Sequence, residues 1–395
     1  MSYPYSLPTT GALSFTDYLE TAAPYSSEIS DATAQRGRLR TVLKELKKES
    51  HSARDYQVII NTIEEYLPYL VSIVNCLEKN ELALKKSIET SWRSTLSDHI
   101  IHTGSNAPRI SCNDIQYELI FVLMTYAYAC SLQTNDLIKT VEETSNTHLY
   151  NKAADTLNTA ASVFHFVATD VIPTWQQSPG NRPVETIREF SVALSKKNFL
   201  RMALADAQSI AINKALVTSN ISKSLIAKLY MGVAGQYEMA YGLISSISGT
   251  QDVSTDLKKY LSDGTQFYKA MAKKYLAMDA NDNQKMGQAV GFARDCKADL
   301  RAIQHSSLSK AHIRKSAIAA RAAREEEAVT DLLSKYTMIN DTVSYELIPT
   351  RQDLQKIIPG GRGVLELKHF NLPKPVFGPS NEKGEKNYLL EGRYF

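Results

Sequence analysis

The chain has few cysteines and carries none of the short motifs that mark a common active site. Its four cysteines, Cys76, Cys112, Cys130 and Cys296, lie far apart and form no Cys-x-x-Cys pair. This argues against a zinc site or a secreted disulfide scaffold and fits a reducing compartment. The sequence also lacks a phosphate loop, a glycine-rich nucleotide fingerprint, His-Glu-x-x-His and Gly-x-Ser-x-Gly. We therefore expect no cofactor, no metal and no enzymatic activity. The alternative, an enzyme or a small-molecule-binding protein, would need a site assembled from residues far apart in sequence.

Long apolar runs and a strong net charge are missing as well. No run reaches the roughly 18 uninterrupted apolar residues that a membrane span needs, and the N-terminus lacks the basic and apolar regions of a signal peptide. The 45 Lys and Arg nearly balance the 42 Asp and Glu, for a net charge of +3, so no global field favours nucleic acid. With 43% hydrophobic residues, the 395-residue chain is predicted to be a folded cytoplasmic protein with a large core.

Helical periodicity is what the sequence does have, most clearly in the stretch Asn198–Ile244. Apolar residues recur there at three- and four-residue steps, on either side of a polar turn near Thr218–Ser222. Ser222 or Ser219 is expected to cap the second helix. The stretch predicts a pair of core helices. The positions that recur every four residues in the second helix are Leu225, Leu229, Val233, Tyr237 and Tyr241.

The rest of the chain follows the same pattern. Residues 1–31 are predicted to be extended, with apolar side chains laid across a helical core, and Ser87–Leu96 has strand character. Asn113 is expected to cap a helix, with Gln116 completing a capping box. Consecutive helix pairs favour a tetratricopeptide-like solenoid. The other predicted helices are Ala53–Lys79, Asn146–Asp170, Asp256–Asp279, Asn283–Gln304 and about Ser309–Met338.

Five segments, in order, resemble the motifs of the BRO domain, the family of Alix. The central pair contributes AQSIAINKA (Ala207–Ala215) and LIAKLYMGVAGQYEMA (Leu225–Ala240), which are similar to the family's AQAQE…KA and IAKLA…YY segments. NDIQYELIFVLMTYAYACSL (Asn113–Leu132) and YNKAADTLNTAASVFHFV (Tyr150–Val167) resemble two of its helices. NDTVSYELIP (Asn340–Pro349) resembles the signature that closes the domain.

The resemblance implies a mainly α fold. We expect a BRO domain over residues 1–375, boomerang-like, with a tetratricopeptide-like helical solenoid core and a small β-sheet. Its strands should lie in the first 115 residues and near Leu365. Residues 376–395, which are polar and rich in Pro and Gly, are expected to form a flexible C-terminal tail.

The resemblance also implies a hydrophobic patch that receives the C-terminal amphipathic helix of an ESCRT-III subunit of the Snf/CHMP type. Leu225 and Leu229 are the expected anchors, pointing out of the solenoid, although the pattern by itself would make them core residues. The family carries an aromatic anchor at the position of Ala211, and Ile212 would compensate for it. The remaining positions that the resemblance implies are Lys214, Lys228, Lys152, Phe166 and Val167, the lysines meeting acidic side chains of the ligand. Tyr345 is implied in a second surface patch.

Within the family, the opening YPYSLPTTGALSF and the short tail ending in aromatic residues look most like fungal members of the Pal/Rim ambient-pH pathway. This implies a non-enzymatic scaffold, recruited from the cytoplasm to plasma-membrane or endosomal ESCRT sites, upstream of proteolytic activation of a transcription factor. Its expected partners are the ESCRT-III helix and other Pal/Rim components, and not nucleic acid. The alternative is an adaptor that sorts cargo into multivesicular bodies.

A basic run, Lys310–Arg324, contains no acidic residue. One interpretation is a solvated helix face. The functional interpretation is peripheral contact with an anionic membrane, since basic clusters on helices are attracted to acidic lipid.

Overall fold

A computed structural model describes most of the chain. The described residues are 2–20, 25–49, 54–97, 106–144, 146–175, 183–187, 190, 192, 202–218, 221–247, 253–308, 317–363 and 368–378.

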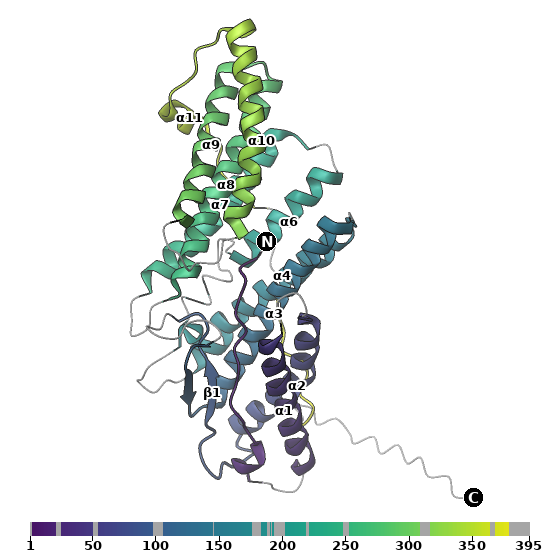
Figure 1. Cartoon of the computed structure of the whole chain (residues 1–395). Coiled ribbons are helices and arrows are strands. Elements are labelled where there is room, and N and C mark those ends of the chain that lie inside the picture. The colour runs from purple at the N-terminus through teal and green to yellow at the C-terminus, as the bar shows by residue number, and fades with distance from the viewer. Residues whose placement is uncertain are drawn as a thin grey trace, which may run out of the picture.

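The fold is an elongated stack of helices with a small hairpin at its side (Figure 1). Sequential helices pack against one another from α1 and α2 at one end to α9 and α10 at the other, as a solenoid requires. Two short strands, β1 (Thr90–Arg93) and β2 (Arg109–Cys112), pair antiparallel. The helices are α1 (Ser26–Lys48), α2 (Tyr56–Glu78), α3 (Ile115–Thr144), α4 (Leu149–Phe166), α6 (Met202–Thr218), α7 (Lys223–Ser246), α8 (Thr255–Asp282), α9 (Met286–Leu308), α10 (Ala317–Ile339) and α11 (Arg351–Ile357).

The predicted fold class, mainly helical with a small sheet, is confirmed. Ser222 caps α7 as expected, its hydroxyl accepting a hydrogen bond from the Leu225 N–H. The cap predicted at Asn113 is wrong by one residue, because Asp114 accepts the bond from the Gln116 N–H and the Gln116 amide donates to Glu78 instead. The strand expected near Leu365 lies outside the described residues.

Helix α3 is the core of the N-terminal half. Among the described residues it is the one helix long and apolar enough to cross a membrane, but 89% of its most apolar window is buried inside the protein. Helices α2 and α4 and strand β1 pack around it. Its apolar side chains are therefore buried by the protein's own core.

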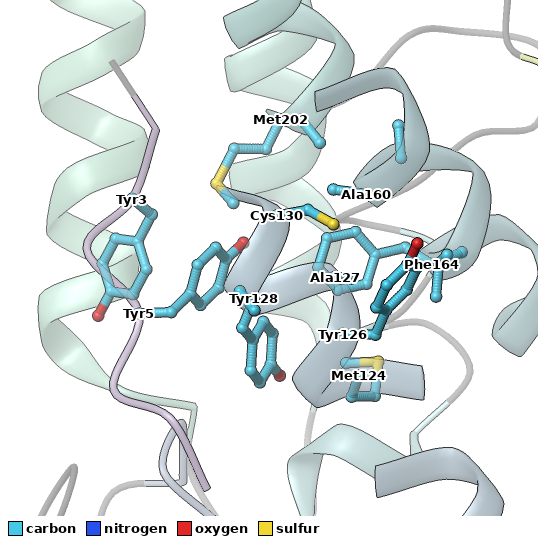
Figure 2. Packing of buried hydrophobic residues seen from close by; sticks show 14 of the residues in the cluster. Tyr3, Tyr5, Met124, Tyr126, Ala127, Tyr128, Cys130, Ala160, Phe164 and Met202 are labelled. Carbon is cyan, nitrogen blue, oxygen red and sulfur yellow. The ribbon is translucent and has the colours of Figure 1, made fainter. Parts of the chain in front are cut away.

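Residues 2–14 run as an extended chain along the helices, as predicted (Figure 1). The extended chain predicted as far as residue 31 is wrong at its end, because α1 already begins at Ser26 and buries Ile29 on its inner face. Tyr3 and Tyr5 are buried, and the Tyr5 ring stacks on Tyr128 of α3 at a centroid distance of 4.4 Å (Figure 2). Tyr3 meets the edge of Tyr260 on α8 at 5.2 Å. The segment thus joins α3 to α8, which are far apart in sequence.

A buried ion pair holds the N-terminal half together. Arg36 of α1 donates through Nε to Oε1 of Glu118 on α3 at 3.0 Å, and both side chains are fully buried. The Arg36 guanidinium also donates to the Gly11 carbonyl at 2.6 Å. Glu118 accepts a second bond from Trp92 Nε1 of β1 at 2.6 Å. One carboxylate therefore links α1, the N-terminal segment, β1 and α3.

The C-terminal segments cross the solenoid in the opposite direction. Residues 359–363 pass over α7, and residues 368–378 lie along α4 and then α2, where the Phe377 N–H donates to Ser72 Oγ at 3.1 Å. Phe377, two residues past the boundary predicted at 375, is buried. The flexible tail stays a prediction, because residues 379–395 lie outside the described ones.

The basic run Lys310–Arg324 lies partly outside the described residues, which resume at Ala317. Within α10, Arg321 points inward and places its guanidinium over the ring of Phe267 at 5.1 Å. Arg321 is therefore not available to a membrane surface.

We expect Glu118→Gln to lower the free energy of unfolding by about 3–5 kcal/mol, because it leaves the buried Arg36 without a counter-charge. Chemical unfolding of the variant measures this loss. The matched control is Glu65→Gln, which breaks the exposed Arg38–Glu65 pair and should cost at most about 1 kcal/mol. Equal effects of the two substitutions would contradict a central role for the buried pair.

Asp206 of α6 is a buried carboxyl surrounded by tyrosines. Tyr237 donates its hydroxyl to Oδ1 of Asp206 and lies 3.3 Å from the Tyr260 hydroxyl. Oδ2 of Asp206 has no hydrogen-bond partner among the described residues. Burial raises the pKa of Asp206 from its ordinary value of 3.8 to about 7.

This raised pKa predicts that the protein loses stability as pH rises from about 4 to about 7. In that window the unfolded chain releases the Asp206 proton while the folded chain retains it, and above it both states are ionised. The contribution to the slope is at most about 1.4 kcal/mol per pH unit. Asp206→Asn, which mimics the protonated form, should flatten the dependence in urea unfolding measured across pH. An unchanged slope in this variant would exclude Asp206 as its source.

Candidate functional site

Helices α4, α6 and α7 bring together most of the predicted site residues. Helix α6 packs against both α4 and α7. Ala211 of α6 is half-buried, and Leu225 of α7 is half-buried with its apolar side chain packed against the core. We call the surface that these three helices share the α4–α6–α7 face. Ala211 and Leu225 form its apolar part.

Lysines surround this apolar part of the face. Lys152 of α4 and Lys228 of α7 are exposed, and neither forms an ion pair with a described residue. Lys214 of α6 donates through Nζ to Oδ1 of Asn151 on α4 at 2.8 Å, which joins the two helices. The face therefore combines a small apolar surface with a positive rim.

Leu229 does not point outward as expected. Its side chain is 8% exposed and belongs to the core, whereas Leu225, one helical turn earlier, reaches the surface. The periodicity correctly placed both leucines on one side of α7, but the predicted exposure of Leu229 is wrong. The physical reason is that Leu229 packs into the buried hydrophobic cluster that also contains Ile226 and Val233 of the same helix.

Residues 359–363, which we call the C-terminal strap, cross α7 at Lys228–Gly232. The Arg362 N–H donates to the Lys228 carbonyl at 3.0 Å, and Gln208 of α6 donates to the carbonyls of Arg362 and Leu229 at 2.9 and 3.0 Å. A Cβ on Gly232 would lie 2.3 Å from the Arg362 carbonyl oxygen, so only glycine permits this crossing. Gly232 thus accommodates the strap.

The other predicted apolar anchors are less accessible than the resemblance implies. Ile212 is 2% exposed and Val167 is fully buried, so neither reaches the surface and Ile212 cannot replace an aromatic anchor. Phe166 is half-buried because Phe370 packs edge-on against it at a centroid distance of 5.5 Å. The strap and the segment that contains Phe370 therefore border the face at both sides.

Sequence reasoning missed several residues of this region. Leu216 and Val217, on the last turn of α6, are exposed at 37% and 65%. Adjacent apolar residues directly before a polar turn were the available signal. Arg362 and Phe370 lie in segments with no periodicity, so nothing in the sequence connected them to α4 or α7.

Tyr345, predicted in a second surface patch, is on the surface of the distal end. Its side chain is 75% exposed, its φ of +50° is left-handed, and Val343 and Leu347 beside it are also exposed. Asn340 fixes the turn by bonding both the N–H and the carbonyl of Glu346, at 3.1 and 3.0 Å. The turn therefore holds three neighbouring apolar side chains in solvent.

Comparison with known proteins decides the family. The model of the BRO1-like domain matches residues 12–365. The chain belongs to the BRO1-like domain family. Within the described residues, no group of His, Cys, Asp or Glu is placed to hold a metal ion.

BRO1-like relatives and structures match over almost the whole chain. The "pH-response regulator protein palC" of Cryptococcus neoformans is 27% identical, over 100% of this chain and 99% of the relative. The palC protein of Emericella nidulans is 23% identical, with coverage of 99% and 92%. The likeness to fungal pH-response members expected from the termini is thus confirmed.

The fold is that of known BRO1 structures. The structure named "ALIX BRO1 CHMP4C complex" aligns with a TM-score of 0.66 at 15% identity, over 96% of this chain and 98% of that one. "Structure basis for endosomal targeting by the Bro1 domain" aligns with a TM-score of 0.58 at 14% identity, covering 93% of each chain. These likenesses confirm the BRO fold.

The two leucines of α7 should respond differently to the same substitution. Leu229→Asp should unfold or aggregate the protein, because it places an unpaired charge among buried apolar groups. Leu225→Asp should cost at most about 1 kcal/mol, since a partly exposed side chain loses little packing. Thermal melting of the two variants tests this order, and a stable Leu229→Asp variant would show that this position is not part of the core.

Proposed function

We propose that this protein is a non-enzymatic adaptor of ambient-pH signalling. In this proposal it binds the C-terminal amphipathic helix of an ESCRT-III subunit, of the Snf/CHMP type, on the α4–α6–α7 face. The observation that carries the signalling role is the full-length similarity to proteins named pH-response regulator palC. The BRO1 structure solved as a complex with CHMP4C supports the class of ligand.

The geometry of the face fits an amphipathic helix with acidic side chains. Leu225 and the small Ala211 supply a shallow apolar surface, and Lys152, Lys214 and Lys228 supply positive charge around it. An apolar centre within a polar rim is the arrangement by which helix ligands are recognised. With Leu229, Ile212 and Val167 buried, Leu225 is the principal anchor and the lysines contribute more of the selectivity.

The exposed turn at Tyr345 is a second patch in the same proposal. Its three apolar side chains, Val343, Tyr345 and Leu347, lie in solvent at the end of α10, far along the solenoid from α4. This patch would take other components of the Pal/Rim pathway while the α4–α6–α7 face holds the ESCRT-III helix. Such a scaffold would be recruited from the cytoplasm to plasma-membrane or endosomal ESCRT sites and act before proteolysis of a transcription factor by a separate protease.

The second candidate function is an adaptor for cargo sorting at multivesicular bodies. It is favoured by the structural likeness to a domain described as acting in endosomal targeting. Deletion of the gene separates the two functions. The signalling role predicts impaired growth at alkaline pH with intact multivesicular sorting, whereas the sorting role predicts a sorting defect at every pH.

Binding to a peptide of the ESCRT-III C-terminal helix tests the proposed face. We expect Leu225→Asp to weaken binding by roughly 2 kcal/mol, as for a central interface anchor, and Lys228→Glu to weaken it in a salt-dependent manner. Fluorescence anisotropy of a labelled peptide measures both. The matched control is Val58→Asp on α2, an exposed apolar residue away from this face, which should leave binding unchanged. Absence of wild-type binding at tens of micromolar, about −6 kcal/mol, would exclude the face as an ESCRT-III site.

A further inference from the structure

A group of cations gathers on the surface where α1 meets the β1–β2 hairpin. On α1, Arg40, Lys44 and Lys47 follow one another at four- and three-residue steps and so share a helix face. On the hairpin, Arg93 and Arg109 are directly opposite each other in the antiparallel register. We call these five residues the α1–hairpin patch.

The patch places like charges close together, which lowers the stability of the fold. Like charges directly opposite across two strands, or one turn apart on a helix, are destabilising. Burial together with the guanidinium groups of Arg93 and Arg40 lowers the pKa of Arg109, and burial together with Arg40 and Arg109 lowers the pKa of Lys44. The helix and the hairpin therefore repel each other across their junction.

Nothing in the described part of the chain neutralises this charge. None of the five residues forms an ion pair there, whereas the adjacent Arg36 and Arg38 are paired with Glu118 and Glu65. Arg93 donates only to neutral oxygens, to Thr9 Oγ1 at 3.0 Å and to the Asn106 carbonyl at 3.4 Å among them. Nε of Arg40 is buried without an acceptor among the described residues. The five cations of the patch therefore have no counter-charge within the described part of the chain.

We propose that the α1–hairpin patch binds the phosphate-bearing surface of an anionic membrane. Clusters of about four to eight Lys and Arg on a helix are typical of contact with acidic phospholipids. Single-stranded nucleic acid sites add exposed aromatic rings to such a groove, but Trp92, the aromatic residue beside Arg93, is fully buried. The excess charge is also local, since the whole chain carries only +3.

The proposal deepens the membrane recruitment in the proposed function, but it does not depend on the α4–α6–α7 face. The patch belongs to α1 and the hairpin, whereas ESCRT-III binding is assigned to α4, α6 and α7. The patch is separate from the basic run Lys310–Arg324, of which Arg321 is turned inward over Phe267.

Sedimentation with vesicles tests the patch. The full chain should sediment with phosphatidylcholine vesicles that contain phosphatidylserine and not with phosphatidylcholine alone, and added salt should release it. Lys44→Glu with Lys47→Glu should reduce binding to the acidic vesicles by at least about tenfold, since each favourably placed cation contributes about 1 kcal/mol. The matched control is Arg294→Glu with Lys335→Glu, an equal change of charge on exposed residues of α9 and α10, at the other end of the stack (Figure 1).

The Lys44→Glu/Lys47→Glu variant should melt at or above the wild-type temperature, because it relieves the repulsion within the patch, and the Arg294→Glu/Lys335→Glu variant should melt like the wild type. Both should bind the ESCRT-III peptide with wild-type affinity, which separates failure of this proposal from failure of the proposed function. Equal binding to neutral vesicles, no binding to acidic ones, or equal losses in the two variants would overturn the proposal. Competition with a single-stranded oligonucleotide tests whether nucleic acid is the ligand instead. If the oligonucleotide binds the patch more tightly than acidic vesicles at the same salt concentration, the membrane assignment is wrong.

Discussion

The ion pair between Arg36 and Glu118 is the interaction on which the arrangement of the N-terminal half depends. A charge in a dry interior is tolerated only with a counter-charge and hydrogen bonds in good geometry. Glu118 meets this demand by collecting donors from α1 and β1, while Arg36 also holds the carbonyl of Gly11. The positions of these elements on α3 are therefore coupled. Because each helix of a solenoid packs on its neighbour, the placement of α3 also sets that of α4, and through α6 that of α7.

The two extended ends of the chain connect helices that are not consecutive in the sequence. Tyr3 and Tyr5 connect α8 to α3, and the C-terminal segments connect α7 to α4 and then to α2. Nearest-neighbour packing cannot make these connections, since the helices involved are not sequential. The burial of Leu229 in the core has a functional consequence as well. It limits the apolar surface of the α4–α6–α7 face to Leu225 and its small neighbours, so that the lysine rim becomes a larger part of any recognition there.

Charge is arranged locally in this protein, since its overall balance is close to neutral. Lys152 and Lys228 of the α4–α6–α7 face and the cations of the α1–hairpin patch form no ion pair among the described residues, while other cations are neutralised within the fold, as Lys273 is by Asp299 at 2.6 Å. Such separation suits an adaptor that meets several partners. Each surface carries its own short-range field, which salt screens within about 10 Å, and no long-range field attracts unrelated polyanions.

The sequence by itself determined the helices, the cap at Ser222, the extended N-terminal segment and the family, because periodicity and capping are local properties and the family motifs are local as well. It also placed Leu225 and Leu229 on one side of α7. Only the tertiary structure decided that Leu229 is buried and Leu225 is not, since a four-residue step defines a shared face but not what covers it. The strap that crosses α7 beside this position comes from more than a hundred residues further along the chain. The α1–hairpin patch could not be predicted from the sequence for the same reason. Its charges come from three separate segments, and their repulsion exists only once strand register and helix packing have brought them together.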